Sequence, residues 1–336
     1  MKKWISKALY TSPVLAVAAV QMLSISFANE LSKIAFTQIE PLYVSWWRVA
    51  LTAVIMMSWR RPLSAKKRAN LPKDAKTWII LAALGVAVAG MNGVFYIAIQ
   101  TLNSGVAMAM EFIGPLAVAV FTGHTWRECM GAALAFLGVF VLGGAALFSI
   151  GPSSVPGIIA ILCSGVLWAI YIVLGRMVAH GSSGLDNLTI SLTLGWVFQS
   201  IFLAVPAVRG VVQPAAYATW ARGEFGWVKL VGLLLVVTLG ASIVSYLLDQ
   251  VLMRRVTATR FSVMQAILPA VNLLVSVLFG SRPTWLDFVG VGVIVFAVII
   301  SFTSDEDPLP SHDLTSRHHT RVKDSEGRVE EIDIAD

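Results

Sequence analysis

Charged residues are scarce in this chain. Asp, Glu, Lys and Arg make up 13% of its 336 residues, whereas soluble domains carry roughly 25%. Hydrophobic residues reach 57%, and the mean hydropathy is +0.77. These values exclude a water-soluble globular protein. The apolar residues instead fall in runs of about 20, which is the length of a membrane-spanning helix.

Signatures of common enzyme chemistry are also missing. The sequence contains no GxxxxGK[ST] phosphate loop, no HExxH zinc motif and no GxSxG nucleophile turn. Its two cysteines, Cys129 and Cys163, form no CxxC pair and are expected to be packing residues. We therefore expect no cofactor, no metal site and no enzymatic activity. An intramembrane enzyme such as an acyltransferase is the alternative, but it needs a reactive His, Cys or Asp near a membrane surface, and none stands out.

The positions of Lys and Arg along the chain account for the net charge of +6, so that nucleic-acid binding is not needed to explain it. With the N-terminus inside, the predicted cytoplasmic segments collect eighteen of the 25 Lys and Arg residues, whereas five lie on the other side. Positive residues gather on the cytoplasmic side of bacterial membrane proteins. The sequence therefore predicts a multi-pass protein of a bacterial inner membrane with both termini in the cytoplasm, in contact with lipid and not with nucleic acid.

The fold class follows from the apolar runs. The sequence predicts an all-α integral membrane protein with ten transmembrane helices, followed by an acidic tail over residues 304–336 that is expected to be disordered. The predicted spans are residues 13–36, 41–59, 77–100, 103–122, 127–147, 157–179, 187–208, 227–251, 256–279 and 284–303.

An internal repeat divides these spans into two halves, residues 1–150 and 151–303. The matching positions are Gly90, Tyr96 and Gln100 with Gly240, Tyr246 and Gln250, at an offset of 150 residues, Glu111 and Pro115 with Gln265 and Pro269, at 154, and Gly131 with Gly290, at 159. Each half holds five spans, and an odd number places the second half upside down relative to the first. Inverted repeats of this kind are common in secondary transporters.

Glu111 is the clearest candidate for a functional residue. It lies near the middle of a predicted span, where a carboxylate must face the bundle interior or carry a proton. Pro115 has no N–H, so the carbonyl of Glu111 loses its helical partner, and Pro269 does the same to the carbonyl of Gln265. Both prolines are predicted to be structural kinks that leave polar groups at the level where transporters bind solutes.

Other polar and aromatic side chains recur at helical spacing and are expected to face a common cavity. The predicted substrate-binding set is Glu111, Asn92, Tyr96, Gln265, Trp168, Tyr171, Tyr246 and Ser242. Arg48 and Glu30 lie at similar depths in the first two spans, and an ion pair between them is predicted; binding of a substrate carboxylate by Arg48 is the alternative.

Two stretches resemble a known family. GMNGVFY at residues 90–96 and MEFIGPLAV at residues 110–118 are similar to EamA-type members of the drug/metabolite transporter superfamily, and residues 47–51 and 167–171 match more loosely. The resemblance covers residues 10–303. It implies ten helices in two inverted five-helix repeats, a central cavity, cytoplasmic termini and export of amino acids or related metabolites.

Together these features predict a secondary exporter of small polar metabolites, amino acids such as threonine or homoserine, working by alternating access around a midplane cavity. A proton is the candidate coupling ion, because Glu111 could carry one. The other role open to Glu111 is to bind the ammonium group of the substrate. Transport of hydrophobic drugs or nucleotide sugars by the same fold is the alternative.

Overall fold

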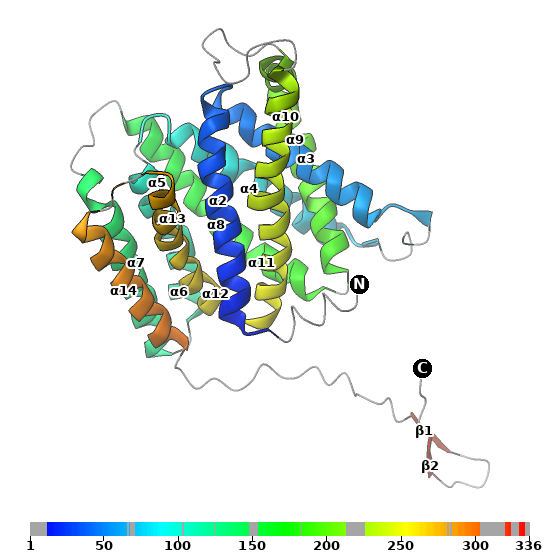
Figure 1. Cartoon of the computed structure of the whole chain (residues 1–336). Helices are drawn as coiled ribbons and strands as arrows, with labels where there is room; N and C mark the ends of the chain where they lie inside the picture. The colour runs from blue at the N-terminus through cyan, green and yellow to red at the C-terminus, as the bar shows by residue number, and fades with distance from the viewer. Residues whose placement is uncertain are drawn as a thin grey trace. The chain divides into compact units, whose positions relative to one another are not determined.

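The computed structural model describes residues 12–65, 67, 71–102, 104–123, 125–147, 154–181, 183–212, 226–280, 282, 284–302, 320–323 and 329–332. The chain divides into two units, Met1–Thr303 and Ser304–Asp336. The first unit is a bundle of helices (Figure 1). Its helices are α2 (Val14–Phe36), α3 (Pro41–Arg60), α4 (Ala75–Ala98), α5 (Ser104–Glu111), α6 (Ile113–Thr122), α7 (Trp126–Leu147), α8 (Val155–His180), α9 (Gly184–Val212), α10 (Gly226–Thr238), η3 (Leu239–Val244), α11 (Ser245–Arg255), α12 (Ala258–Gln265), α13 (Ile267–Leu278) and α14 (Trp285–Phe302).

The helices lie where the apolar runs predict them. α5 with α6, α10 with η3 and α11, and α12 with α13 each correspond to one predicted span. Counted in this way, every segment begins and ends within four residues of the ends of its predicted span. Six segments of the described chain are long and apolar enough to cross a membrane, and Ile113–Thr122 and Trp285–Ser301 are shorter apolar helices. A helical membrane protein is thereby confirmed, whereas the number of ten spans stays a prediction.

Two of the predicted spans are interrupted just before a proline. α5 ends at Glu111 and α12 ends at Gln265, and in each case one residue separates the helix from the next. Pro115 and Pro269 lie four residues beyond these ends, where a residue with an N–H would bond the Glu111 and Gln265 carbonyls. The interruptions therefore occur at matching places in the two halves, and the kinks expected at Pro115 and Pro269 stay a prediction.

A third irregularity was not foreseen from the sequence. Between α10 and α11 the chain forms a π-helical turn, η3. Such turns are rare in proteins, and those that occur are often found at functional sites. The carbonyl oxygen of Gly240 accepts hydrogen bonds from Ser24 Oγ at 3.0 Å and Ser245 Oγ at 3.1 Å. Side-chain hydroxyls thus satisfy a carbonyl that lies in the irregular turn.

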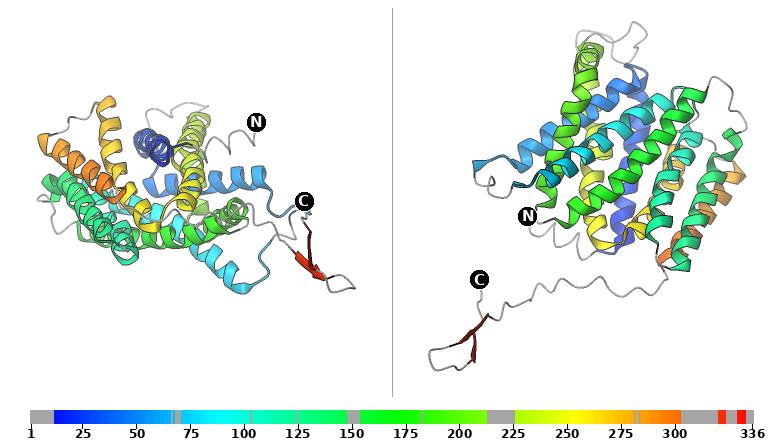
Figure 2. Two further views of the ribbon diagram at one scale, coloured as in Figure 1. Left: turned by 90° about the horizontal axis from the view of Figure 1, so that it is seen from below. Right: turned by 180° about the vertical axis from the view of Figure 1, so that it is seen from behind.

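Helices from the two halves pack on each other in a regular pattern. α3 packs against α9, α6 against α12 and α7 against α14, so helices at the same place in each half meet. α7 and α14 lie side by side in both Figure 1 and Figure 2. α4 packs against α8, and α2 packs against α10, η3 and α11, so the first helix of each half contacts the third helix of the other. Helices at equivalent places in the two predicted halves therefore meet in pairs.

The second unit contains two short strands, β1 (Thr320–Lys323) and β2 (Val329–Ile332). They pair antiparallel, with Thr320 opposite Ile332 and Lys323 opposite Val329. The sequence predicts disorder over the whole of residues 304–336, and these eight residues differ from that prediction. The alternation of β-branched and charged residues in β1 suits a strand, although an isolated two-stranded hairpin is marginally stable at best. The rest of the tail lies outside the described residues.

Candidate functional site

The break between α5 and α6 is held against α8 by direct backbone contact. A Cβ atom added to Gly114 would lie 1.9 Å from the carbonyl oxygen of Gly165, and a Cβ added to Gly165 would lie 2.9 Å from the carbonyl oxygen of Glu111. Only glycine permits this approach. The contact brings Ser164 Oγ to 2.5 Å from Glu111 Oε1 and 3.0 Å from the carbonyl oxygen of Met91. Glu111 is therefore positioned by a neighbouring helix as well as by its own.

A cavity of about 120 Å³ adjoins this break. A single water needs only about 10–15 Å³ by this kind of measure, so the cavity has room for a small solute. Helices α2, α3, α4, α5, α8 and α13 supply its walls, with both apolar and polar side chains. The lining residues are Ile25, Asn29, Arg48, Met91, Asn92, Phe95, Tyr96, Met108, Glu111, Trp168 and Leu268.

Arg48 supplies a buried positive charge to the cavity. Its side chain is buried, and its guanidinium group donates to the hydroxyl of Tyr96. Weaker contacts reach Ser242 Oγ at 3.4 Å and the Ala241 carbonyl oxygen at 3.5 Å, both in η3. The guanidinium carbon also lies 5.8 Å from the centre of the Tyr96 ring, within the range of a cation–π contact. All of these partners are neutral groups.

The predicted ion pair between Arg48 and Glu30 is wrong. Glu30 Oε1 accepts instead from Lys33 Nζ at 2.7 Å, one turn further along α2. Within the described part of the chain, no carboxylate forms an ion pair with Arg48. The reason is direction: the guanidinium group points to α4 and η3, where Tyr96 and Ser242 meet it. Arg48 and the carboxyl group of Glu111 thus line one cavity, and neither has an ionic partner among the described residues.

The predicted substrate-binding residues fall into two groups. Glu111, Asn92, Tyr96 and Trp168 line the cavity. Tyr171, Tyr246, Ser242 and Gln265 are buried and are not among its lining residues.

The second group holds the first in place or lies behind it. Tyr246 accepts a hydrogen bond from Asn92 Nδ2 at 3.1 Å, and Ser242 contacts Arg48. Tyr171 donates to Asp249 Oδ2 at 2.8 Å. The side-chain oxygen of Gln265 has no hydrogen-bond partner among the described residues. We infer that these four side chains shape the cavity without lining it in this conformation.

Sequence reasoning missed two polar groups of the site. Ser164 was not singled out, because a lone serine in an apolar helix gives no signal of its own; its place follows from the contact between Gly114 and Gly165. Asn29 also lines the cavity, and its position one residue before Glu30 could have flagged it as part of a polar turn in the first span.

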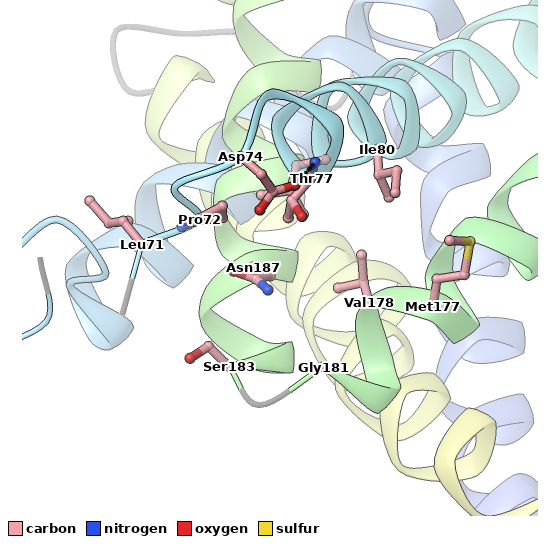
Figure 3. Close-up of a pocket in the computed structure, with 11 residues that line it drawn as sticks. Leu71, Pro72, Asp74, Thr77, Ile80, Met177, Val178, Gly181, Ser183 and Asn187 are labelled. Carbon is pink, nitrogen blue, oxygen red and sulfur yellow. Dashed lines mark hydrogen bonds between the residues drawn. The ribbon is translucent and has the colours of Figure 1, made fainter. Parts of the chain in front are cut away.

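A larger recess of about 660 Å³ lies away from this cavity, with the start of α4, the end of α8 and the start of α9 around it (Figure 3). Its charged lining residue, Asp74, is exposed and caps α4 by accepting from the Thr77 backbone N–H at 2.7 Å. Hydrogen bonds from the Thr77 side chain and backbone hold the pKa of Asp74 below its ordinary value. This recess offers a helix cap, whereas the smaller cavity is lined by the buried guanidinium group of Arg48 and the carboxyl group of Glu111, so we place the candidate site in the smaller one.

Comparison with known proteins agrees with a transporter. The chain matches the EamA-like transporter family over residues 12–150 and again over residues 155–303. It is 27% identical over 291 residues to the threonine/homoserine exporter RhtA of Escherichia coli strain K12, covering 84% of this chain and 89% of that protein. An uncharacterised transporter of Bacillus subtilis, YyaM, is 22% identical over 80% of this chain and 87% of that protein.

A solved crystal structure shares the fold, with a TM-score of 0.64 and 15% sequence identity, over 86% of this chain and 96% of that chain. The two family matches together cover nearly all of the helical unit. The chain is therefore a multi-pass membrane transporter that contains two copies of the EamA domain and belongs to the EamA-like transporter family.

Proposed function

We propose that this protein exports small zwitterionic amino acids, of the threonine and homoserine type, across a bacterial inner membrane. The relatives named as threonine/homoserine exporters support the substrate class. The ten helical segments would span the membrane as two inverted five-helix repeats with both termini in the cytoplasm, as the positive-inside pattern favours. Rocking of one repeat against the other would expose the cavity to each side in turn.

The observation that carries this proposal is the pair of opposite charges on one cavity. Taking a charged group out of water costs several kcal/mol unless a partner compensates it. A zwitterion supplies both partners at once, its ammonium for Glu111 and its carboxylate for Arg48. Arg48 has the guanidinium fork that suits a carboxylate, and Asn29 and Asn92 offer hydrogen bonds to a substrate hydroxyl.

The same cavity is less suited to the alternative substrates. A hydrophobic drug would leave both charges unpaired, which is costly in a buried site. A nucleotide sugar carries phosphates and calls for several cations, whereas Arg48 is the basic residue among the lining side chains that the structure describes.

The test pairs variants with substrate analogues in proteoliposomes. Threoninol lacks the carboxylate of threonine, and 3-hydroxybutyrate lacks its ammonium. In counterflow assays wild type should prefer threonine to both. Glu111→Gln should lose affinity for threonine by about 5–150-fold, equivalent to about 1–3 kcal/mol, and should no longer discriminate against 3-hydroxybutyrate. Arg48→Met should no longer discriminate against threoninol.

Arg61→Met is the matched control, because Arg61 is exposed at the end of α3 and bonds the carbonyl of Ser58. It should behave as wild type. If Arg48→Met and Glu111→Gln discriminate among the three compounds as well as wild type does, the two residues do not bind the zwitterion and the site assignment fails. If wild type exchanges no amino acid, the proposed function itself fails.

A further inference from the structure

A second buried carboxylate lies outside the cavity. Asp249, on α11, is only 3% exposed. Its Oδ2 atom accepts from the hydroxyl of Tyr171 on α8 at 2.8 Å. Its Oδ1 atom is buried and has no hydrogen-bond partner among the described residues. A carboxylate with a bare oxygen and no cation is costly in such a place, so the group must hold a proton or meet a cation in another conformation.

Among the residues that the structure describes, no cation contacts the Asp249 carboxyl group. α11 packs against α2, η3, α8, α9 and α12. The titratable groups that interact with the Asp249 carboxyl are two phenols, Tyr171 and Tyr246.

The charges on these elements are engaged elsewhere or lie at helix ends. Three arginines donate to backbone carbonyls: Arg176 to those of Met253 and Val256, Arg254 to those of Ala179 and Gly181, and Arg255 to that of Ser12. Two carboxylates form ion pairs, Glu30 with Lys33 and Asp186 with Arg60 and Lys67. The remaining groups lie near helix ends: His180 bonds the carbonyl of Arg176, Arg209 lines a recess near the end of α9, and Arg260 lies in the first turn of α12.

A chain of side chains joins Asp249 to the cavity. The ring centres of Tyr171 and Tyr246 are 6.0 Å apart. Tyr246 accepts a hydrogen bond from Asn92, and Asn92 lines the cavity together with Glu111. Asp249 itself is not among the lining residues. The occupant of the cavity and the state of Asp249 are thus linked through contiguous groups, while a substrate in the cavity does not touch Asp249.

We propose that Asp249 is the coupling-proton site of this transporter, separate from the substrate site at Glu111 and Arg48. This inference rests on the proposed function. A substrate ammonium can compensate Glu111, but only a small ion can reach Asp249, and a carboxyl oxygen, with one donating hydroxyl beside it, is a poor set of ligands for a metal cation. In each cycle an O–H bond forms at Asp249 with a proton from outside and breaks with release of that proton to the cytoplasm, as one zwitterion leaves. The exchange moves one positive charge inward.

The experiment measures exchange and coupling separately in proteoliposomes. Threonine counterflow reports exchange, and a pH-sensitive dye in the lumen reports proton movement driven by a threonine gradient. Asp249→Asn should keep threonine counterflow within about 2-fold of wild type but lose the proton signal and accumulation driven by a pH gradient. Asp287→Asn, at the start of α14, is the matched control and should keep both. Tyr171→Phe should shift the pH at which the coupled flux is half-maximal, because it removes the hydroxyl that bonds Asp249.

The outcomes distinguish this inference from the proposed function. Absence of threonine counterflow by wild type refutes the proposed function. Normal counterflow with a threonine-driven proton signal in Asp249→Asn overturns the inference alone, as does coupling of wild type to a sodium gradient. Loss of the proton signal in Glu111→Gln with counterflow kept would also overturn it. If Asp249→Asn does not fold, Tyr171→Phe decides: an unchanged pH profile of coupled flux refutes the role of Asp249.

Discussion

The contact between Gly114 and Gly165 is the feature on which the position of Glu111 depends, so Gly114→Ala is an informative perturbation. The new Cβ would lie 1.9 Å from the carbonyl oxygen of Gly165 and 2.6 Å from its carbonyl carbon. Carbon–carbon contacts are optimal at about 3.5–4.0 Å, so α6 and α8 must separate by roughly 1 Å. The obstacle is backbone and cannot rotate away.

The cost can be estimated from measured overpacking. Added methylenes in well-packed cores destabilise proteins by about 1–3 kcal/mol, occasionally more. We expect the upper part of this range, because neither helix can relax without moving a second contact. Since about 1.4 kcal/mol changes an equilibrium constant tenfold, the ratio of folded to unfolded protein should fall by roughly 30–100-fold.

The assay is the fraction of protein that stays monodisperse in detergent after heating, followed by threonine counterflow in proteoliposomes. Gly114→Ala should melt well below wild type and bind threonine more weakly, because one residue joins Glu111 at the end of α5 to α6, so a shift of α6 displaces Glu111. Gly292→Ala is the matched control: nothing lies within 4 Å of its added Cβ, and alanine favours a helix over glycine by roughly 0.5–1 kcal/mol. If Gly114→Ala melts and transports as the control does, the close approach of α6 and α8 is wrong.

Three further predictions concern other parts of the chain. Asp186 bonds Arg60 and Lys67, each at 2.8 Å, so Asp186→Asn should lower the melting temperature and make the segment after α3 more sensitive to protease, and an unchanged digestion pattern would contradict this. Truncation after Ser304 should leave transport intact, and lost activity at normal membrane expression would reveal a role for the tail. Reporters fused at each terminus should both signal cytoplasm, and a periplasmic signal from the C-terminus would exclude an even number of spans.

The sequence alone determined where the helices lie and where two of them are interrupted. Runs of apolar residues set where each helix begins and ends, because a chain in lipid must satisfy its backbone groups within each segment. The breaks after Glu111 and Gln265 follow from Pro115 and Pro269, whose chemistry acts within one turn. Glu111 was identifiable for the same reason: a carboxyl group in an apolar run is costly wherever the run packs.

Only the tertiary structure decided which polar groups meet. Depth along two helices suggested that Arg48 would pair with Glu30, but the rotation of each helix directs Arg48 to Tyr96 and leaves Glu30 to Lys33. Rotation also places Tyr171 behind the cavity, although helical spacing predicted it as a wall. Hydrophobic periodicity is weak when lipid and protein core are both apolar, so the sequence fixes depth in the membrane much better than it fixes facing.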